Sequence, residues 1–581
     1  MTTPPLRGKR GRDRKIGERV AADFAARHAP PTDDEAVDFD VAEVDSEVDD
    51  HRRAEERTEA ERAAAQDRLR AIEARRAATA AAAGASLAKK GSGHRLPDLS
   101  GLPPLLIRTG SFGSLLERLG PPVGEAAKPD RGRHAGLASV PHGAKSYLAA
   151  ALALAATGER LVWIARDAEI GDRVAEELGA WLGDPSAVVV LEPRTALAYE
   201  RSELVADETA ARVAALAAWR SGRARVMVAG VQSLLQHTIS PDDLPDAPRE
   251  IKPGARLHQD ALLHDLFDLG YSPVPEVAGR GEFARRGGIV DVFPPSMPLP
   301  IRIEFFGDEI DSLRAFDPTD QRTVQTVDRI VLLPASEFLM PHGGGAAIRE
   351  RLGRLAARLP ERLTTDLARF EGDGDEAGSR AAGSAAPGAR PGPGGTPPTA
   401  TRAVPVGDAA EVWATYLAPA TGLDHVGPGT LLLLDEPGDI AEAAEFLWRQ
   451  ADERRTELVA AGDLPKDWPS TYLPPRDWKT RLVASRTLEL TWESEPPGDA
   501  AMASGRLGSG DLFGWREPQL PLGRAARLPD AVRTWADEGA RIVLASDQSA
   551  RLADILGEAG HVVGVVQRIV DPPPTGAIAL V

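Results

Sequence analysis

Two neighbouring residues, Lys145 and Ser146, have the types and order with which a phosphate-binding P-loop ends. A P-loop has the pattern G-x-x-x-x-G-K-[ST]. Its glycines let backbone N–H groups surround the phosphates, its lysine contacts the β- and γ-phosphates, and its hydroxyl binds magnesium. Here Ser139 and Ala144 replace the two required glycines. A Cβ at either position obstructs the close approach of phosphate, and Pro141 removes one amide donor.

Gly143 lies one residue before the second required glycine, so this stretch predicts a degenerate nucleotide site at the start of a helix. The other half of such a site is a strand ending in Asp-Glu, which holds magnesium and the attacking water. The apolar run Leu431–Leu434 is followed by Asp435 and Glu436. We interpret both halves as remnants, and expect no catalytic residue, no metal site and no cofactor. ATP with magnesium would bind only if the P-loop still works.

Short apolar segments and amphipathic segments alternate around the first half-motif. The sequence predicts strands at 161–164, 188–191 and 226–229, and helices at 170–182 and 211–219. Strands of this apolar kind alternating with helices are typical of a parallel sheet that is covered by helices on both faces. The predicted fold class is therefore α/β.

The composition limits the possible functions. The chain has 581 residues, 42% of them hydrophobic, so we expect several domains. It has no cysteine, which excludes disulfides and Cys-based metal or redox sites and indicates a cytoplasmic location. We find no apolar run of about 18 residues and no signal peptide. The net charge of -18 favours a protein partner over tight DNA binding.

The most informative stretch, residues 281–322, contains a strictly alternating strand at 301–306. Its odd-numbered positions are apolar and form the natural core face, because strand side chains have a period of two. The other face carries Arg302, Glu304 and Phe306 in one row. An aromatic ring flanked by charges is typical of a protein-binding hot spot. The alternative is that a neighbouring element buries Phe306 while Arg302 and Glu304 form an ion pair.

This stretch resembles the interaction domain shared by the excision-repair protein UvrB and the bacterial transcription-repair coupling factor. The resemblance rests on GEFARRGGIVDVFPP at 281–295 and PIRIEFFGDEIDSLR at 300–314. Gly270-Tyr271 before it and residues 332–338 after it are also similar to the family. We judge the resemblance to extend from about Leu105 to the end of the chain.

The resemblance implies a function for the outward row. In that family the small domain binds UvrA, and the contact positions fall on Arg286, Arg302 and Phe306, with Glu304 in the same row. It also implies a RecA-like domain whose nucleotide site is degenerate; UvrB has an Asp-Glu-x-His box at the matching place, and here its His is missing. The family contacts RNA polymerase and DNA through a C-terminal part with the motor, and we expect this chain to be truncated before that part.

These observations together predict the following organisation. It consists of a charged, disordered or helical tail (1–100), the first part of a RecA-like α/β domain (105–250), an inserted small α+β domain that binds UvrA (251–335), the second part of the RecA-like domain (336–485) with a disordered insertion (371–404), and a further α/β segment (486–581).

The predicted function is a UvrA-recruiting adaptor that mimics UvrB in transcription-coupled nucleotide excision repair. One alternative is an ATP-dependent, UvrB-like DNA helicase that uses Lys145, Ser146, Asp435 and Glu436. A second alternative is a damage-verifying DNA binder, which would need an aromatic hairpin; the chain has only 5 Tyr and no Tyr-rich hairpin.

Overall fold

The computed structural model describes residues 97–120, 134–155, 160–245, 248–383, 402, 407–427, 429–492, 512–516, 527–546 and 548–581. Almost all of the predicted tail, and the predicted insertion from 384 to 401, lie outside these residues. No helix among the described residues is long and apolar enough to cross a membrane.

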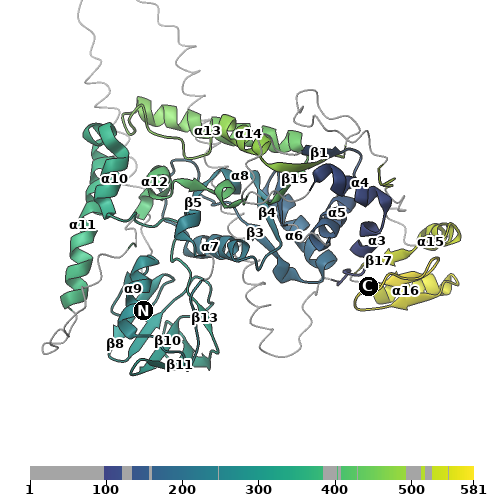
Figure 1. The fold of residues 1–581 in the computed structure, drawn as a ribbon, viewed down its shortest axis with the longest axis horizontal. Helices are drawn as coiled ribbons and strands as arrows, with labels where there is room; N and C mark the ends of the chain where they lie inside the picture. The colour runs from purple at the N-terminus through teal and green to yellow at the C-terminus, as the bar shows by residue number, and fades with distance from the viewer. Residues whose placement is uncertain are drawn as a thin grey trace, which may run out of the picture. The chain divides into compact units, whose positions relative to one another are not determined.

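One of two six-stranded sheets is parallel throughout, as the sequence predicts (Figure 1). Its strands are buried on both faces, which explains why they are continuous apolar runs with little polar alternation. In spatial order they are β1 (His134–Leu137), β16 (Arg486–Leu490), β15 (Leu431–Asp435), β2 (Leu161–Ala165), β4 (Val226–Gly230) and β3 (Val188–Leu191).

Two hydrophobic cores lie on opposite faces of this sheet. Trp163 of β2 points into one core, which contains residues of α5 (His142–Leu154) and α6 (Ala168–Leu182). Its neighbour Ile164 points into the other, which contains residues of α7 (Ala206–Arg220). The same second core includes residues of α8 (Val231–Leu235), α12 (Ala410–Leu417), α13 (Pro437–Ala460) and α14 (Pro475–Ala484).

A second six-stranded sheet, mostly antiparallel, follows in the middle of the chain and packs on α9 (Gln259–Asp268). It belongs to the small domain and is called the small sheet below. The segment that enters the small domain, β6 (Glu250–Ile251), pairs antiparallel with the segment that leaves it, β13 (Ile330–Val331). In spatial order the strands of the small sheet are β12 (Thr323–Thr326), β11 (Glu309–Phe316), β10 (Ile301–Phe306), β9 (Ile289–Val292), β8 (Glu282–Arg286) and β7 (Ser272–Pro273).

Two of the predicted boundaries are corrected. Helix α11 (Glu361–Gly383) follows α10 (Gly344–Leu352) and continues into the range where a disordered insertion was expected to begin. Strand β16 was assigned to the last segment, but it lies between β1 and β15 in the parallel six-stranded sheet. Its sequence RTLEL contains polar residues, which explains why no buried strand was predicted there.

The last segment forms a three-stranded parallel sheet in the order β17 (Ile542–Leu544), β19 (Ile578–Leu580), β18 (Val563–Val565). Helices α15 (Leu528–Asp537) and α16 (Ser549–Glu558) share a hydrophobic core with it. A second cluster joins Val543 and Ala579 of this sheet to Leu99 and Ala180.

Candidate partner-binding surface and candidate nucleotide site

The strand pairing of β10 defines the outward face of the small sheet. Ile301 and Ile303 are fully buried, and a bulge between Glu304 and Phe305 interrupts the register with β11. Glu304 is opposite Ile289 of β9, which is itself opposite Arg286 of β8. Adjacent strands are about 4.8 Å apart, so the backbones at Arg286 and Glu304 are separated by about 10 Å. The structure therefore brings all four residues predicted from the resemblance onto one face.

Phe306 is the most exposed aromatic side chain in this region, with 83% of its surface accessible. It ends β10, and Gly307 then turns the chain with a φ of 63° that favours glycine. No described element buries the ring, so the alternative in which a neighbour covers Phe306 is not observed. A phenyl ring exposed to this extent loses unfavourable contact with water when a partner covers it.

Arg302 is held by contacts within the small domain. Its Nε and Nη2 donate to the two carboxylate oxygens of Asp291 at 2.8 and 2.9 Å, and Asp291 is 1% exposed. The guanidinium carbon lies 4.7 Å from the centroid of the Phe316 ring. The hydrogen bond to Asp291 raises the pKa of Arg302 above its ordinary value. Arg302 thus has a fixed orientation, and its loss would leave Asp291 buried without its partner.

Glu304 and Arg286 have partners other than those expected from the pattern. Glu304 accepts a hydrogen bond from Ser312 Oγ at 2.7 Å and pairs with Arg314 at 3.1 Å. Arg286 is half exposed and lies 3.4 Å from Glu276. The Arg302–Glu304 ion pair of the alternative is therefore not the pairing observed. Sequence reasoning missed Asp291 and Arg314, although each stands directly opposite Arg302 in the strand register.

An ion pair joins the two half-motifs of the predicted nucleotide site. Lys145 is 1% exposed, and its Nζ lies 2.6 Å from Asp435 Oδ1 and 2.5 Å from Glu436 Oε1. The ammonium therefore contacts the two carboxylates in place of phosphates. Ser139 has a φ of 55°, the left-handed conformation that a P-loop glycine adopts without strain. Glu436 also has a positive φ, of 58°.

The hydroxyl of the half-motif is also occupied. Ser146 Oγ donates to Glu177 Oε2 at 2.6 Å and accepts from Trp181 Nε1 at 3.2 Å. Burial raises the pKa of Glu177 above its ordinary value. Ser146 Oγ also lies 3.5 Å from the carbonyl oxygen of Gly143. All five residues predicted from the half-motifs thus lie in one region of the fold, at the start of α5 and the end of β15.

A histidine that sequence reasoning missed lies beside these carboxylates. His142 has a ring nitrogen within 4.8 Å of carboxylate oxygens of Asp435 and Glu436, and its ring stacks on Trp492 at 5.9 Å. The signal available in the sequence was its place inside the half-motif, three residues before Lys145. Lys145 already supplies the positive charge between the two carboxylates.

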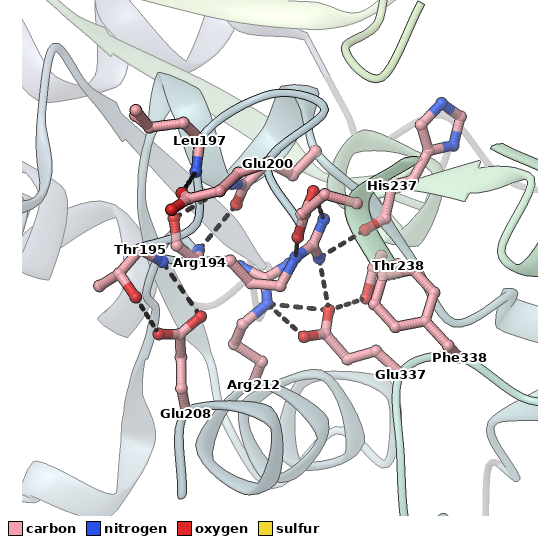
Figure 2. Close-up of polar contacts among 12 residues, drawn as sticks. Arg194, Thr195, Leu197, Glu200, Glu208, Arg212, His237, Thr238, Glu337 and Phe338 are labelled. Carbon is pink, nitrogen blue, oxygen red and sulfur yellow. Dashed lines mark hydrogen bonds and ion pairs between the residues drawn. The ribbon is translucent and has the colours of Figure 1, made fainter. Parts of the chain in front are cut away.

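Figure 2 shows a buried network of charges beside the exit of the small domain. Glu337 accepts a bifurcated hydrogen bond from Arg212 Nε, at 2.8 Å to each carboxylate oxygen, and one at 3.2 Å from Arg194 Nη1. It also accepts one at 2.7 Å from Thr238 Oγ1. Arg194 forms a second ion pair with Glu411 of α12 at 2.5 Å. Two guanidinium groups are thus balanced by two carboxylates in a region closed to water.

The network shifts the ionisation of its members in opposite senses. Burial alone would lower the pKa of Arg194, but Glu411 and Glu337 raise it overall. Burial alone would raise the pKa of Glu337, but Arg212 and Arg194 lower it below its ordinary value of 4.5. Arg194 and Glu337 are therefore charged at neutral pH, and each depends on its partners to remain buried.

Replacing Lys145 by Met should destabilise the protein by about 3 kcal/mol, because Asp435 and Glu436 would lose their shared cation. Urea unfolding measures this effect. Lys479→Met is the control, since its pair with Glu445 is exposed and should contribute less than about 1 kcal/mol. An unchanged unfolding midpoint for Lys145→Met would contradict a structural role for the ion pair.

Replacing Glu337 by Gln should destabilise the protein by about 3–5 kcal/mol at pH 7. Because its folded-state pKa is lowered, Glu337 stabilises the fold fully above its ordinary pKa of 4.5, and this contribution is lost as the pH falls through the lowered pKa. The difference between parent and variant should therefore narrow in acid. Urea unfolding at neutral and acidic pH measures it, and a difference that widened in acid would contradict the assignment.

The small domain matches a known protein-family model. Residues 250–338 match the model of the UvrB interaction domain. The transcription-repair-coupling factor of Escherichia coli K12 is 35% identical over 178 residues, which are 31% of this chain and 15% of that protein. The one from Mycobacterium tuberculosis CDC 1551 is 33% identical over 276 residues, 46% of this chain and 21% of that protein.

UvrABC system protein B of Thermosipho africanus is 29% identical over 163 residues, which are 28% of this chain and 23% of that protein. The chain therefore spans about a fifth of the length of the curated relatives it matches. Through residues 250–338 it carries a match to the UvrB interaction domain, and over about half its length it is similar to transcription-repair-coupling factors.

Proposed function

We propose that this chain recruits UvrA as a UvrB-like adaptor in transcription-coupled nucleotide excision repair. The proposal rests on Phe306, a phenyl ring with 83% of its surface exposed on the same face as Arg302 and Glu304, within a match to the UvrB interaction domain. An exposed ring is the kind of anchor that a partner pocket takes up.

The charged side chains on the same face as Phe306 would give the contact its direction. Arg302 has its guanidinium fixed by Asp291, so little side-chain entropy is lost when a partner approaches. Arg286 and Arg314 are nearly half exposed and pair with single carboxylates. These groups form a polar rim around an apolar centre, which is the usual anatomy of a specific protein interface.

This role requires no nucleotide chemistry from the chain. The Lys145 ammonium is neutralised by Asp435 and Glu436, and Ser146 is engaged by Glu177. A nucleotide would have to break these contacts before its phosphates and magnesium could bind. The longer relatives are named for coupling transcription to repair. From the resemblance to them, we propose RNA polymerase and DNA as further partners of the whole protein.

The second candidate is a UvrB-like, ATP-dependent helicase. It is favoured by the position of Lys145 and Asp435, which the fold still brings together at the ends of α5 and β15. Equilibrium dialysis with ATP and magnesium distinguishes the two. Saturable binding that Lys145→Ala abolishes would favour the helicase, whereas the adaptor proposal expects no binding.

The direct test is calorimetric titration of UvrA into this chain and into a Phe306→Ala variant. We expect the variant to bind at least about 2 kcal/mol more weakly, about 30-fold, because it lacks the anchor. Val324→Ala is the matched control: Val324 is 58% exposed on β12 of the same sheet, and its loss should have little effect.

Added UvrB should compete with the chain for UvrA if the chain mimics its contact. A folded parent chain that does not bind UvrA would contradict the adaptor proposal. Equal loss of affinity in the Phe306 and Val324 variants would place the contact elsewhere.

A further inference from the structure

Among the described strands, β18 lies at an edge of the three-stranded sheet and has an unusual composition. Among the described strands it pairs only with β19, at the end of the three-stranded sheet. Val562 is 92% exposed, Val565 54% and Val566 40%. Natural sheet edges are usually protected by lysine, proline or a covering element. The stretch from Val562 to Val566 contains neither lysine nor proline, and no charged residue.

The direction of the backbone groups along β18 follows from one hydrogen bond. Val566 N–H donates to the carbonyl of Leu580 at 2.8 Å, so residue 566 faces β19. Alternate residues of a strand direct their backbone groups to the same side, so Gly564 also faces β19. The N–H and C=O groups of Val563 and Val565 therefore point away from the sheet, where a further strand could pair with them.

The sequence of this edge identifies the strand that fits it. Val562-Val563-Gly564-Val565-Val566 reads the same in both directions around Gly564. Two copies related by a twofold axis would therefore pair antiparallel with every residue opposite an identical residue type. Val563 would be opposite Val565 of the second copy, and both have outward backbone groups. Each such pair exchanges two hydrogen bonds, so the symmetric ladder has about four.

The geometry points to a homodimer in which β18 of one chain pairs antiparallel with β18 of another, joining two three-stranded sheets into one. The twofold axis passes beside Gly564, where the two strands form a pair without hydrogen bonds. The Val562 side chains, now exposed, then lie against Val566 of the second copy. Such isologous contacts are the commonest form of soluble homodimer.

The interface involves few residues from each copy. Stable interfaces typically use about 20–30 residues on each side, so this dimer should be weak and its population should depend on protein concentration. Sedimentation velocity across a concentration series measures this dependence.

A single cysteine gives a sharper test, because the chain has no cysteine of its own. In the dimer, two Gly564 Cα atoms would lie about 4.5 Å apart, within the range that a disulfide spans. The nearest heavy atom to a Cβ built at Gly564 is Ile578 O at 4.0 Å, so Gly564→Cys is compatible with the fold. Under mild oxidation this variant should form a covalent dimer.

Val562→Cys is the matched control. Position 562 is highly exposed, but its equivalent in the second copy lies about 13 Å away along the ladder. Random collision would oxidise the thiol of the Val562→Cys variant at least as fast as that of the Gly564→Cys variant. Preferential cross-linking of the Gly564→Cys variant supports the proposal, whereas equal rates for the two variants, or a monomeric Gly564→Cys variant, would overturn it.

A Val565→Pro variant tests the ladder without a cross-link. Proline removes an N–H that points away from β19, so the bonds within the monomer are retained while those of the dimer are lost. Sedimentation should show this variant as a monomer at concentrations where the parent is partly dimeric. Identical sedimentation of a partly dimeric parent and the variant would place the association at another surface.

Discussion

The buried charge network of Arg194, Arg212, Glu337 and Glu411 is the interaction on which the rest of the described fold depends. It brings together residues that are far apart in the sequence, because Glu337 follows the small domain whereas Arg194 and Arg212 precede it (Figure 2). Charges closed off from water are stable only in pairs with good geometry. Ion pairing of Glu337 therefore fixes the segment that leaves the small sheet, in addition to hydrophobic packing. This segment anchors the domain that carries Phe306.

Ion pairs also fix the positions of charged side chains at the two candidate sites. Where the two half-motifs meet, Lys145 pairs with Asp435 and Glu436, and the proposal of a degenerate nucleotide site rests on this pair occupying the place where phosphate would bind. On the small sheet, Asp291 is buried and orients Arg302 toward the outward face. In both places an arginine or lysine is held by carboxylates, and on the small sheet the exposed ring of Phe306 ends the same strand.

The parallel strands and the outward row were predictable because they depend on local periodicity: Leu431–Leu434 and the alternation at 301–306 each carry their own pattern. Strand β16 was missed because Arg486 and Glu489 are buried only through distant partners; Arg486, for example, donates to the carbonyl of Leu119. The partners of Arg302 and Glu304 were missed for a similar reason. Pairing between strands depends on the register, which a single strand's pattern does not specify.

We propose that UvrA binds the outward face of β10. Hydrogen–deuterium exchange of this chain with and without UvrA tests it most directly, because protection is read along the whole backbone. We expect UvrA to slow exchange in peptides covering 284–291 and 300–314 and to leave exchange at 431–436 unchanged. Protection confined to 431–436 and the start of α5, with none in the small sheet, would contradict it.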